Sequence, residues 1–426
     1  MPIRFINAIV PESGGVRSVS TFAIPRYNSP VPTLSFEDAR ACVLASVQRP
    51  ANLQAEPVSI HQAANRILAE PLIADRDYPP TARSVRDGYA VRAADTPGGF
   101  EIIGEVRAGG APFTAALRER QAVAIMTGAP MPPGADAVLM VEHATQAGNS
   151  IHTDRTLKAG ENFNRQAFEA SQGQPVITSG TRIGHSEIAL AATYGMTVLK
   201  VFRQPKVAIL ATGDEIVEVA DTPLPHQIRN SNTWSLVAQV TRAGGLPIAL
   251  PVARDNLAST RALIERGFEE ASLLLLSGGV SAGKYDLVEP VLAEFGAKFH
   301  FDRVLIQPGQ PLVFGEARGK FFFGLPGNPA STMITFEVFA RAAVERLCGI
   351  DHPQLHLLFA HLTLPFHHRA GLTRFLPAQL DGSSLTPIGW AGSSDVGAMA
   401  RSNAYLVADP ARESYAAGDP IRVLLK

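Results

Sequence analysis

Hydrophobic residues follow several different spacings along this chain, and each spacing predicts a different kind of element. From Phe36 to Val47 they recur at helical intervals, with Ser35 at the N-cap position and Pro50 beyond the end, which predicts an opening helix. The stretch from Tyr78 to Glu169 is rich in Gly and Pro and contains short β-type runs instead. These runs are at 100–106, 122–126 and 137–141. A separate small β domain is therefore expected.

A second region, from Pro205 to Ile350, alternates apolar runs with helical patterns. The four leucines at 273–276 do not alternate with polar residues, so they fit a strand covered on both faces, as in a parallel sheet. Strands are expected at 206–210, 246–252, 273–276, 304–306 and 321–325, and helices at 233–243, 257–270, 285–295 and 331–347. This alternation is typical of a sheet sandwiched by helices. Beyond Ile350 the pattern predicts short strands and no helix.

Together these patterns predict a multidomain protein of the α/β plus β class. The length of 426 residues corresponds to roughly three or four domains. Residues 1–33 form an N-terminal extension without a clear period. We expect a discontinuous linking domain of helix and strand, a small β domain, a three-layer α/β/α domain with a mostly parallel sheet, and a C-terminal β domain. Their boundaries are 34–80 with 170–204, 81–169, 205–350 and 351–426, respectively.

Composition narrows the range of functions. The 38 Lys and Arg nearly balance the 39 Asp and Glu, which argues against a general nucleic-acid binder. Cys42 and Cys348 are far apart, which excludes a disulfide framework and favours a reducing compartment. No apolar stretch approaches the roughly 20 residues that span a bilayer, and the N-terminus lacks a signal-peptide pattern. A cytoplasmic protein without membrane association is expected.

Three predicted strands of the α/β region run into glycine-rich turns. The turns belong to ILATGDEIVE from Ile209, LLSGGVSAGKYD from Leu275 and FFGLPGNPAS from Phe322. Glycines let a ligand approach the backbone, and ligands of open α/β sheets bind beyond the carboxyl ends of the strands. Asn328 followed by Pro329 predicts the start of a helix whose free amides attract an anion. The expected ligand therefore carries phosphate.

Four carboxylates follow the same strand ends. Asp214 and Glu215 come after the first strand, Asp255 after the second and Asp286 after the third. Beside a phosphate these side chains would repel the ligand unless a divalent cation bridges protein and ligand oxygens. The alternative is that they only cap helix N-termini, as Asp and Glu do in any α/β protein.

Two motifs of the β domain also carry polar side chains. SVRDGYAVRAADT from Ser84 contains Asp87 in a turn signal between two arginines, and MTGAPMPPGADAV from Met126 contains Thr127 in a proline-rich loop. Either motif is also explained as a simple turn.

Taken in order, RDGYAVR, MTGAPMPPGADAV, GDEIVE, SGGVSAGKYD and GLPGNPAS closely resemble the motifs of the MoeA family, molybdopterin molybdenumtransferases that include the gephyrin E domain. The resemblance runs from about residue 35 to the end. It implies an elongated homodimer of four-domain subunits, with a cleft between the α/β domain of one subunit and the β domain of the other. Molybdopterin adenylyltransferase and apo-molybdoenzymes are implied as further partners.

By this resemblance, the reaction is insertion of molybdate into adenylylated molybdopterin with release of AMP, dependent on Mg²⁺ or another divalent cation. Catalytic roles would fall to Asp87, Glu215, Asp286 and Arg303, and metal binding to Glu215, Asp255 and Asp286. The residues implied in binding molybdopterin are Thr127, Gly213, Asp214, Ser277, Gly278, Gly279, Ser281, Gly283, Pro326, Gly327 and Asn328.

The chain departs from the family pattern where positive charge is expected. The family's Lys-Pro-Gly-Lys-Pro stretch has Gln307 and Gln310 at its lysine positions, while Arg303 retains one cation nearby. A charge-assisted contact contributes about 1.5 to 3 kcal/mol, so the two replacements weaken anion binding. A second altered stretch, GENFNRQAFEAS from Gly160, keeps Arg165 alone of a run of arginines.

These departures leave two alternatives beside the transferase. One is a catalytically altered paralogue that binds a pterin-nucleotide or delivers cofactor to a specific molybdoenzyme. The other is an interaction scaffold by analogy with gephyrin, which would rest on the fold alone.

Overall fold

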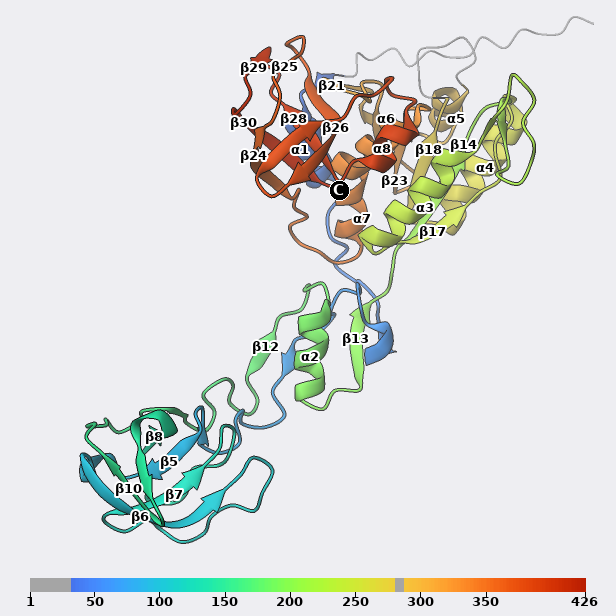
Figure 1. Ribbon diagram of the computed structural model, residues 1–426. Coiled ribbons are helices and arrows are strands. Elements are labelled where there is room, and N and C mark those ends of the chain that lie inside the picture. Colours follow the sequence, from blue (N-terminus) through green and yellow to red (C-terminus); the bar gives the residue numbers. More distant parts are fainter. Residues whose placement is uncertain (1–31, 280–286) are drawn as a thin grey trace, which may run out of the picture.

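The computed structural model describes residues 32–279 and 287–426. The molecule is elongated, with a small β domain at one end and the α/β and C-terminal β domains side by side at the other (Figure 1). A slender linking domain lies between the two ends, and the chain passes through it on the way to the β domain and again on the way back. The multidomain α/β plus β class predicted from the sequence is confirmed.

A six-stranded sheet in the order β17-β14-β18-β23-β22-β19 forms the centre of the α/β domain. Three of its five strand pairs are parallel, from β17 to β23, and the other two are antiparallel. The strands are β14 Lys206–Ala211, β17 Leu246–Ala249, β18 Leu273–Ser277, β19 Lys298–Phe301, β22 Val313–Ala317 and β23 Lys320–Leu325. The sheet is therefore mostly parallel, as expected.

Helices cover both faces of this sheet. They are α3 Ser231–Ala243, α4 Leu257–Glu270, α5 Val288–Glu294, α6 Pro329–Thr335 and α7 Arg341–Leu347, with a π-helical turn, η4 Phe336–Ala340, between the last two. Leu273 and Leu275 are buried in the core that contains α3 and α6, whereas Leu274 and Leu276 are buried in the core that contains α4 and α5. Alternate side chains of a strand point to opposite faces, so a strand covered on both sides requires an uninterrupted apolar run.

Helix α1, Phe36–Ser46, begins as predicted: the Ser35 hydroxyl oxygen accepts a hydrogen bond from the Asp38 amide at 3.0 Å. Phe36 meets the rings of Phe339 and Phe375 edge to face, with centroids 5.8 and 5.2 Å apart. These contacts place α1 in the core of the large end of the molecule. Helix α1 thus packs against the large end, while the strands of the linking domain follow it from Ala55 onwards.

The sheet of the C-terminal domain is closed. Its strands follow the order β21-β26-β27-β24-β30-β28, and β28 pairs again with β26, which leaves few free edges. They are β21 Ile306–Gln307, β24 Leu357–Leu362, β26 Thr373–Asp381, β27 Ser384–Pro387, β28 Ala404–Ala408 and β30 Pro420–Leu425. Because β21 precedes the last strands of the α/β sheet in the chain, the two domains share backbone pairing as well as side-chain contacts.

One helix contradicts the prediction for this domain. Helix α8, Val396–Arg401, follows Asp395, whose side chain accepts a hydrogen bond from the Ala398 amide at 2.8 Å. The sequence pattern predicted no helix beyond Ile350. Six residues are fewer than two turns, too short for a helical period to stand out, and such a helix depends on its cap and on tertiary packing.

The other two domains are small. The linking domain contains β2 Ala55–Ser59, η1 Ile60–Gln62, β3 Leu72–Ile73, β12 Pro175–Ile177, α2 His185–Thr193 and β13 Val198–Phe202. The β domain has a six-stranded sheet, β8-β5-β7-β6-β10-β9. Its elements are β5 Gly88–Val91, η2 Ala93–Asp95, β6 Gly98–Val106, β7 Gln121–Ile125, β8 Ala137–Met140, η3 Val141–His143, β9 Thr145–Ala147 and β10 Ser150–Thr153. Besides the pairs β12-β3 and β13-β2 of the linking domain, the described residues form four more two-stranded pairs: β1 Thr33–Leu34 with β20 Arg303–Val304, β4 Arg83–Ser84 with β11 Phe163–Asn164, β15 Ile216–Val217 with β16 Ile228–Arg229, and β25 Phe366–His367 with β29 Ser414–Tyr415.

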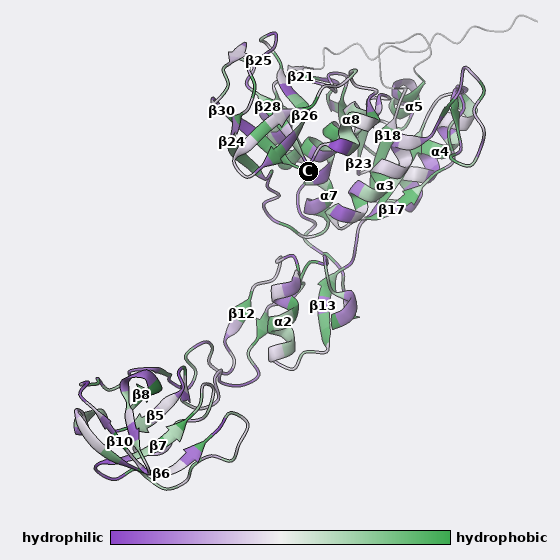
Figure 2. Ribbon diagram, viewed as in Figure 1, coloured by the Kyte–Doolittle hydropathy of each residue, from purple (hydrophilic) through white to green (hydrophobic). Residues whose placement is uncertain are grey.

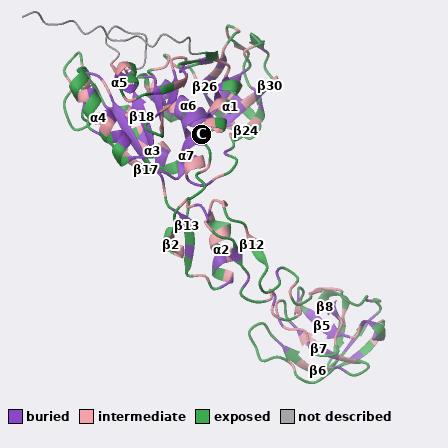
Figure 3. Ribbon diagram, turned by 180° about the vertical axis from the view of Figure 1, so that it is seen from behind, coloured by how far each residue is buried: buried purple, intermediate pink, exposed green. Residues whose placement is uncertain are grey.

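Burial and hydropathy are distributed unevenly between the ends. Hydrophobic residues gather on the central strands of the large end (Figure 2), and most of the buried residues lie there, while the linking domain is mainly exposed or half-buried (Figure 3). Within the described ranges, no helix has both the length and the apolar character needed to cross a bilayer.

Candidate functional site

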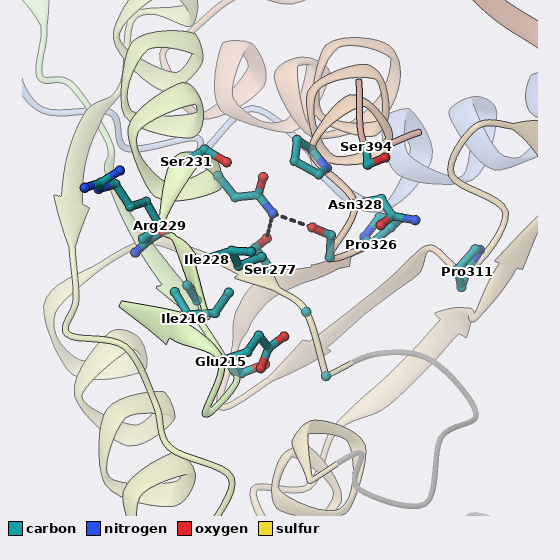
Figure 4. A pocket seen from close by; sticks show the side chains of 18 residues that line it. Glu215, Ile216, Ile228, Arg229, Ser231, Ser277, Pro311, Pro326, Asn328 and Ser394 are labelled. Atoms are coloured by element: carbon teal, nitrogen blue, oxygen red, sulfur yellow. Dashed lines mark hydrogen bonds between the residues drawn. The ribbon is translucent and has the colours of Figure 1, made fainter. Parts of the chain in front are cut away.

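The carboxyl ends of three adjacent parallel strands open into one cavity. Ala211, Ser277 and Leu325, the last residues of β14, β18 and β23, lie in register. The cavity has a volume of about 590 Å³ and is lined by the turns that follow these strands, the start of α3 and a residue of the C-terminal domain (Figure 4). The three glycine turns therefore meet at one place, as the sequence predicted.

The lining residues overlap only partly with the predicted site. Predicted residues that line the cavity are Glu215, Ser277, Gly278, Gly279, Pro326, Gly327 and Asn328. Predicted residues that do not line it are Asp87, Thr127, Gly213, Asp214, Asp255 and Arg303. Three further predicted residues, Ser281, Gly283 and Asp286, lie outside the described residues. Lining residues that sequence reasoning missed are Ala211, Thr212, Ile216, Ile228, Arg229, Asn230, Ser231, Asn232, Pro311, Pro329 and Ser394.

Gly278 and Gly279 allow the second turn to pass close to the first. Their φ angles are +87° and +66°, in the left-handed region that favours glycine. A Cβ atom on Gly278 would lie 2.9 Å from the carbonyl oxygen of Thr212, and one on Gly279 would lie 2.7 Å from Thr212 Oγ1. Glycine is therefore required at both positions for backbone conformation and for space.

The start of helix α3 connects the glycine turns that follow β18 and β23. Asn232 Nδ2 donates to Ser277 Oγ at 2.8 Å and to the Gly327 carbonyl oxygen at 2.7 Å (dashed lines in Figure 4). The helix is capped by a different residue, Asn230, whose Oδ1 accepts from the Thr233 amide at 3.2 Å. No glycine turn precedes Asn232, and its role depends on contacts with residues distant in sequence, so the sequence offered no signal for it.

Helix α6 does not present the row of free amides predicted for it. Asn328 and Pro329 do occupy the N-cap and first helical positions, but the Asn328 side chain donates to Ser393 Oγ at 2.9 Å and makes no cap bond. The Ala330 amide donates to the Ser393 carbonyl oxygen at 2.9 Å. The C-terminal domain thus uses a donor that was expected to bind the ligand, and its Ser394 forms part of the cavity wall.

The predicted carboxylates that the structure describes do not cap helices, and only one of them lines the cavity. Glu215 lines the cavity. Asp214 and Asp255 lie beside each other, and each amide donates to the other's carboxylate, at 3.1 Å to Asp214 Oδ1 and 3.4 Å to Asp255 Oδ2. One oxygen of each therefore joins the two turns, and neither residue caps a helix, since α4 is capped by Asn256. Within residues 32–279 and 287–426, no three His, Cys, Asp or Glu side chains are grouped closely enough to hold a metal ion.

Asp87 and Thr127 lie at the opposite end of the molecule. The Thr127 amide and hydroxyl both donate to Asp87 Oδ1, at 2.6 and 2.8 Å, and these two bonds lower the pKa of the Asp87 carboxyl below its ordinary value. Both side chains are exposed. The structure brings the two residues to each other but not to the cavity of the same chain (Figure 1).

One cationic residue of the cavity wall was missed by sequence reasoning. Arg229, at the end of β16, lines it. Pro311, the last residue of the altered Gln-Pro-Gly-Gln-Pro stretch, is part of the wall, and Gln307 lies in register with Arg374 on β26. Arg374 Nε is buried without a hydrogen-bond partner among the described residues. Arg303, which was predicted to be catalytic, is exposed on β20 outside the cavity wall.

Family models match three consecutive parts of the chain. Residues 34–195 match the MoeA N-terminal region (domain I and II), 208–346 a probable molybdopterin binding domain, and 360–426 the MoeA C-terminal region (domain IV). A molybdopterin molybdenumtransferase of Bacillus subtilis is 35% identical over 388 residues, which cover 87% of this chain and 90% of the relative. One from a Nostoc species is 38% identical over 307 residues, 69% of this chain and 70% of the relative.

Solved structures agree over nearly the whole length. Two structures of the molybdopterin biosynthesis MoeA protein from Pyrococcus horikoshii superpose with TM-scores of 0.70 and 0.77, at 31% and 25% identity. They cover 92% and 93% of this chain, and 99% and 100% of their own. Because sequence similarity spans both ends of the molecule and the folds agree, the chain belongs to the MoeA family.

Proposed function

We propose that this chain is a molybdopterin molybdenumtransferase that inserts molybdate into adenylylated molybdopterin and releases AMP. The observation that carries the proposal is the cavity of about 590 Å³ to which three glycine turns contribute. Cavities of roughly 300 to 1,000 Å³ accommodate ligands of this size. The Bacillus subtilis and Nostoc relatives are named for this activity. We place the reaction in the cytoplasm, between molybdopterin adenylyltransferase and the apo-molybdoenzymes.

The cavity residues divide by chemical role. Ser277 and the turn at Gly278 bring a hydroxyl and a closely approachable backbone to the phosphate and pterin oxygens, and Arg229 balances their negative charge. Asp214 and Asp255 each use one oxygen in their reciprocal amide bonds, which leaves the other for a cation. By the family resemblance, Mg²⁺ would be held by Glu215, Asp255 and Asp286, of which Glu215 lines the cavity and Asp286 lies outside the described residues. When bound, Mg²⁺ would neutralise negative charge on the phosphates as AMP leaves.

The remote position of Asp87 supports a homodimer with shared clefts. In one chain, Asp87 and Thr127 lie at the far end from the cavity (Figure 1). A second subunit in antiparallel arrangement would bring its β domain to this cavity. We therefore propose that Asp87 of each subunit acts in the cleft of the other.

Mixed dimers test this arrangement. Asp87→Ala and Glu215→Ala homodimers are expected to be inactive, whereas a mixed dimer has one cleft in which both residues are native. We therefore expect each mixed dimer that forms on co-expression to have up to about half of the activity of a native dimer. If each site lay within one chain, every site in the mixture would carry a substitution and no activity would return.

The activity itself is tested with purified protein, adenylylated molybdopterin, Mg²⁺ and molybdate. We expect AMP release that depends on molybdate and on Glu215, with Glu215→Gln at least tenfold slower. The absence of pterin binding would exclude the proposal.

A second candidate is favoured by Gln307 and Gln310, which remove two cations from the family pattern. A catalytically altered paralogue would bind adenylylated molybdopterin without releasing AMP. The same assay therefore separates the two functions.

A further inference from the structure

Asn232 makes contacts that helix α3 does not need. The helix is already capped by Asn230, and Asn232, its second residue, lies in the cavity wall with the turns that follow β18 and β23. Its side chain reaches Ser277 at the end of β18 and Gly327 after β23. Three elements distant in the sequence thus meet at one amide group.

The partners determine which way this amide points. The Gly327 carbonyl oxygen can only accept, so the Asn232 atom 2.7 Å from it must be the NH₂ group. The second proton of that NH₂ group is directed at Ser277 Oγ, 2.8 Å away. Asn232 Oδ1 then lies on the other side, buried and without a partner among the described residues. An unpaired Oδ1 costs free energy. The amide keeps this orientation because its two hydrogen bonds, to Ser277 and Gly327, outweigh that cost.

This orientation assigns the Ser277 hydroxyl a direction. Ser277 Oγ accepts from Asn232, so its own proton is left to donate elsewhere. Ser277 is 3% exposed and lines the cavity (Figure 4). Among residues 32–279 and 287–426, the bond from Asn232 is the only hydrogen bond of its side chain. The remaining direction for the Ser277 proton is the cavity.

We propose that Asn232 is a positioning residue that makes the Ser277 hydroxyl a donor to an oxygen of the bound ligand. The inference rests on the proposed function, since the ligand is adenylylated molybdopterin. The oxygen belongs to the molybdopterin part, which has a pterin carbonyl and a phosphate of its own, or to the phosphate of the added AMP, and comparison with molybdopterin lacking the adenylate distinguishes these two sources.

The decisive variant is Asn232→Asp, which has nearly the same shape. A carboxylate at this position cannot donate to Gly327, and it draws the Ser277 proton to itself. We expect the Kd for adenylylated molybdopterin to rise tenfold or more, because a hydrogen bond to a charged ligand is lost. Ser277→Ala should raise the Kd by a similar factor. The double variant should be no weaker than Ser277→Ala, since Asn232 acts through that hydroxyl.

Gln239 offers a matched control on the same helix. Its Nε2 donates to the Met333 carbonyl oxygen at 3.0 Å, and its Oε1 is also buried without a partner among the described atoms, but it does not line the cavity. Gln239→Glu therefore makes the same chemical change away from the ligand. We expect it to lower the unfolding temperature and to leave the Kd within twofold of the wild type.

The outcomes separate the inference from the proposed function. If the wild type binds adenylylated molybdopterin and Asn232→Asp binds it equally well, or if the two substitutions at 232 and 277 act additively, the inference is wrong and the proposed function stands. If the wild type binds no pterin, both are wrong. A loss that is equal for adenylylated and free molybdopterin assigns the Ser277 contact to the molybdopterin part, and a loss confined to the adenylylated form assigns it to the phosphate of the AMP part.

Discussion

The two ends of this molecule carry family motifs of similar strength but differ in how they use them. At the large end, three motifs follow β14, β18 and β23 and converge on one cavity. In the distal β domain, the Asp87 and Thr127 motifs meet each other at an exposed turn and lie outside that cavity. A motif therefore identifies a site within one chain only when the fold of that same domain brings it to a cavity.

The difference follows from how the chain connects each motif to the cavity. Adjacent parallel strands end on the same edge of a sheet, so residues that follow them must lie close together. The β domain is joined to the large end only through the linking domain, which has its own small core around Leu68 and Val201 (Figure 1). Its position relative to the cavity is set by this connection and, in our proposal, by a second subunit.

Among substitutions that separate the two ends, Arg341→Ala is expected to have the largest effect, on the stability of the large end. This buried guanidinium pairs with Glu337 at 2.9 Å and Glu345 at 3.0 Å within the large end. Arg341→Ala leaves each carboxylate with a more exposed partner, Arg242 for Glu337 and Arg182 for Glu345, so we expect the free energy of unfolding to fall by about 3 kcal/mol, the lower end of the range for a broken buried pair. In calorimetry we expect the transition of the large end to move to lower temperature while that of the β domain stays in place.

An exposed pair of the same spacing is the control for Arg341. Arg266 and Glu270 are also four residues apart on a helix, at 2.7 Å, but are largely exposed. Arg266→Ala should change the free energy of unfolding by only about 0.3 to 0.5 kcal/mol. If Arg341→Ala shifted both thermal transitions equally, the two ends would not be independent.

The next largest effect is expected from Gly278. Gly278→Ala forces a Cβ atom into a left-handed position, at about 1 to 2 kcal/mol, and against the Thr212 carbonyl oxygen as well. Gly371 has a φ of +97° with open space around it, so Gly371→Ala carries the backbone strain alone. We expect only Gly278→Ala to reduce AMP release, by tenfold or more. Equal activities of the two variants would show that the close approach of the turns is unimportant.

A smaller effect is expected when the family lysines are restored. Because Arg229 lines the cavity, one positive charge is present there without them. For an active transferase, Gln307→Lys with Gln310→Lys should change the molybdate concentration for half-maximal AMP release by less than threefold. A tenfold gain in anion affinity, about 1.4 kcal/mol, would favour the altered paralogue instead.

The smallest effect is expected in the β domain, from Thr127→Val. The hydrogen bonds from Thr127 lower the pKa of Asp87 below 3.8, so the stability they provide is present above that pH and is lost as the pH falls through the lowered pKa. Thr127→Val removes the hydroxyl bond and keeps the amide bond, so the pKa should rise part of the way towards its ordinary value. The stability should then begin to fall at a higher pH.

Carboxyl chemical shifts measured by NMR during an acid titration check this prediction. Asp77 serves as an internal reference, because the bonds that lower its pKa come from the Gln172 amide and Gln166 side chain. The Asp77 midpoint should not move. An unchanged Asp87 midpoint would mean that the Thr127 hydroxyl contributes nothing to its ionisation.

Local patterns predicted the elements and the place of the cavity, whereas they did not predict its composition. Residues 257–270 form a helix with the expected bounds, and the four leucines at 273–276 form a strand covered on both faces, because periodicity and burial are read over neighbouring residues. Asn232 and Ser394 line the cavity through contacts with residues distant in the chain. Helix α8 was missed because six residues carry too weak a periodic signal.

The amino-acid sequence alone determined the family and the sheet edge where the ligand binds in our proposal, because the order of apolar runs and glycine turns establishes parallel strands with a common end. Only the tertiary structure decided which donors remain for the ligand. The amide of Ala330 is bonded to the C-terminal domain, Ser277 is oriented by Asn232, and Asp87 lies far from the cavity. Hydrogen-bond partners are shared among segments that meet only after folding, so their allocation depends on the assembled structure.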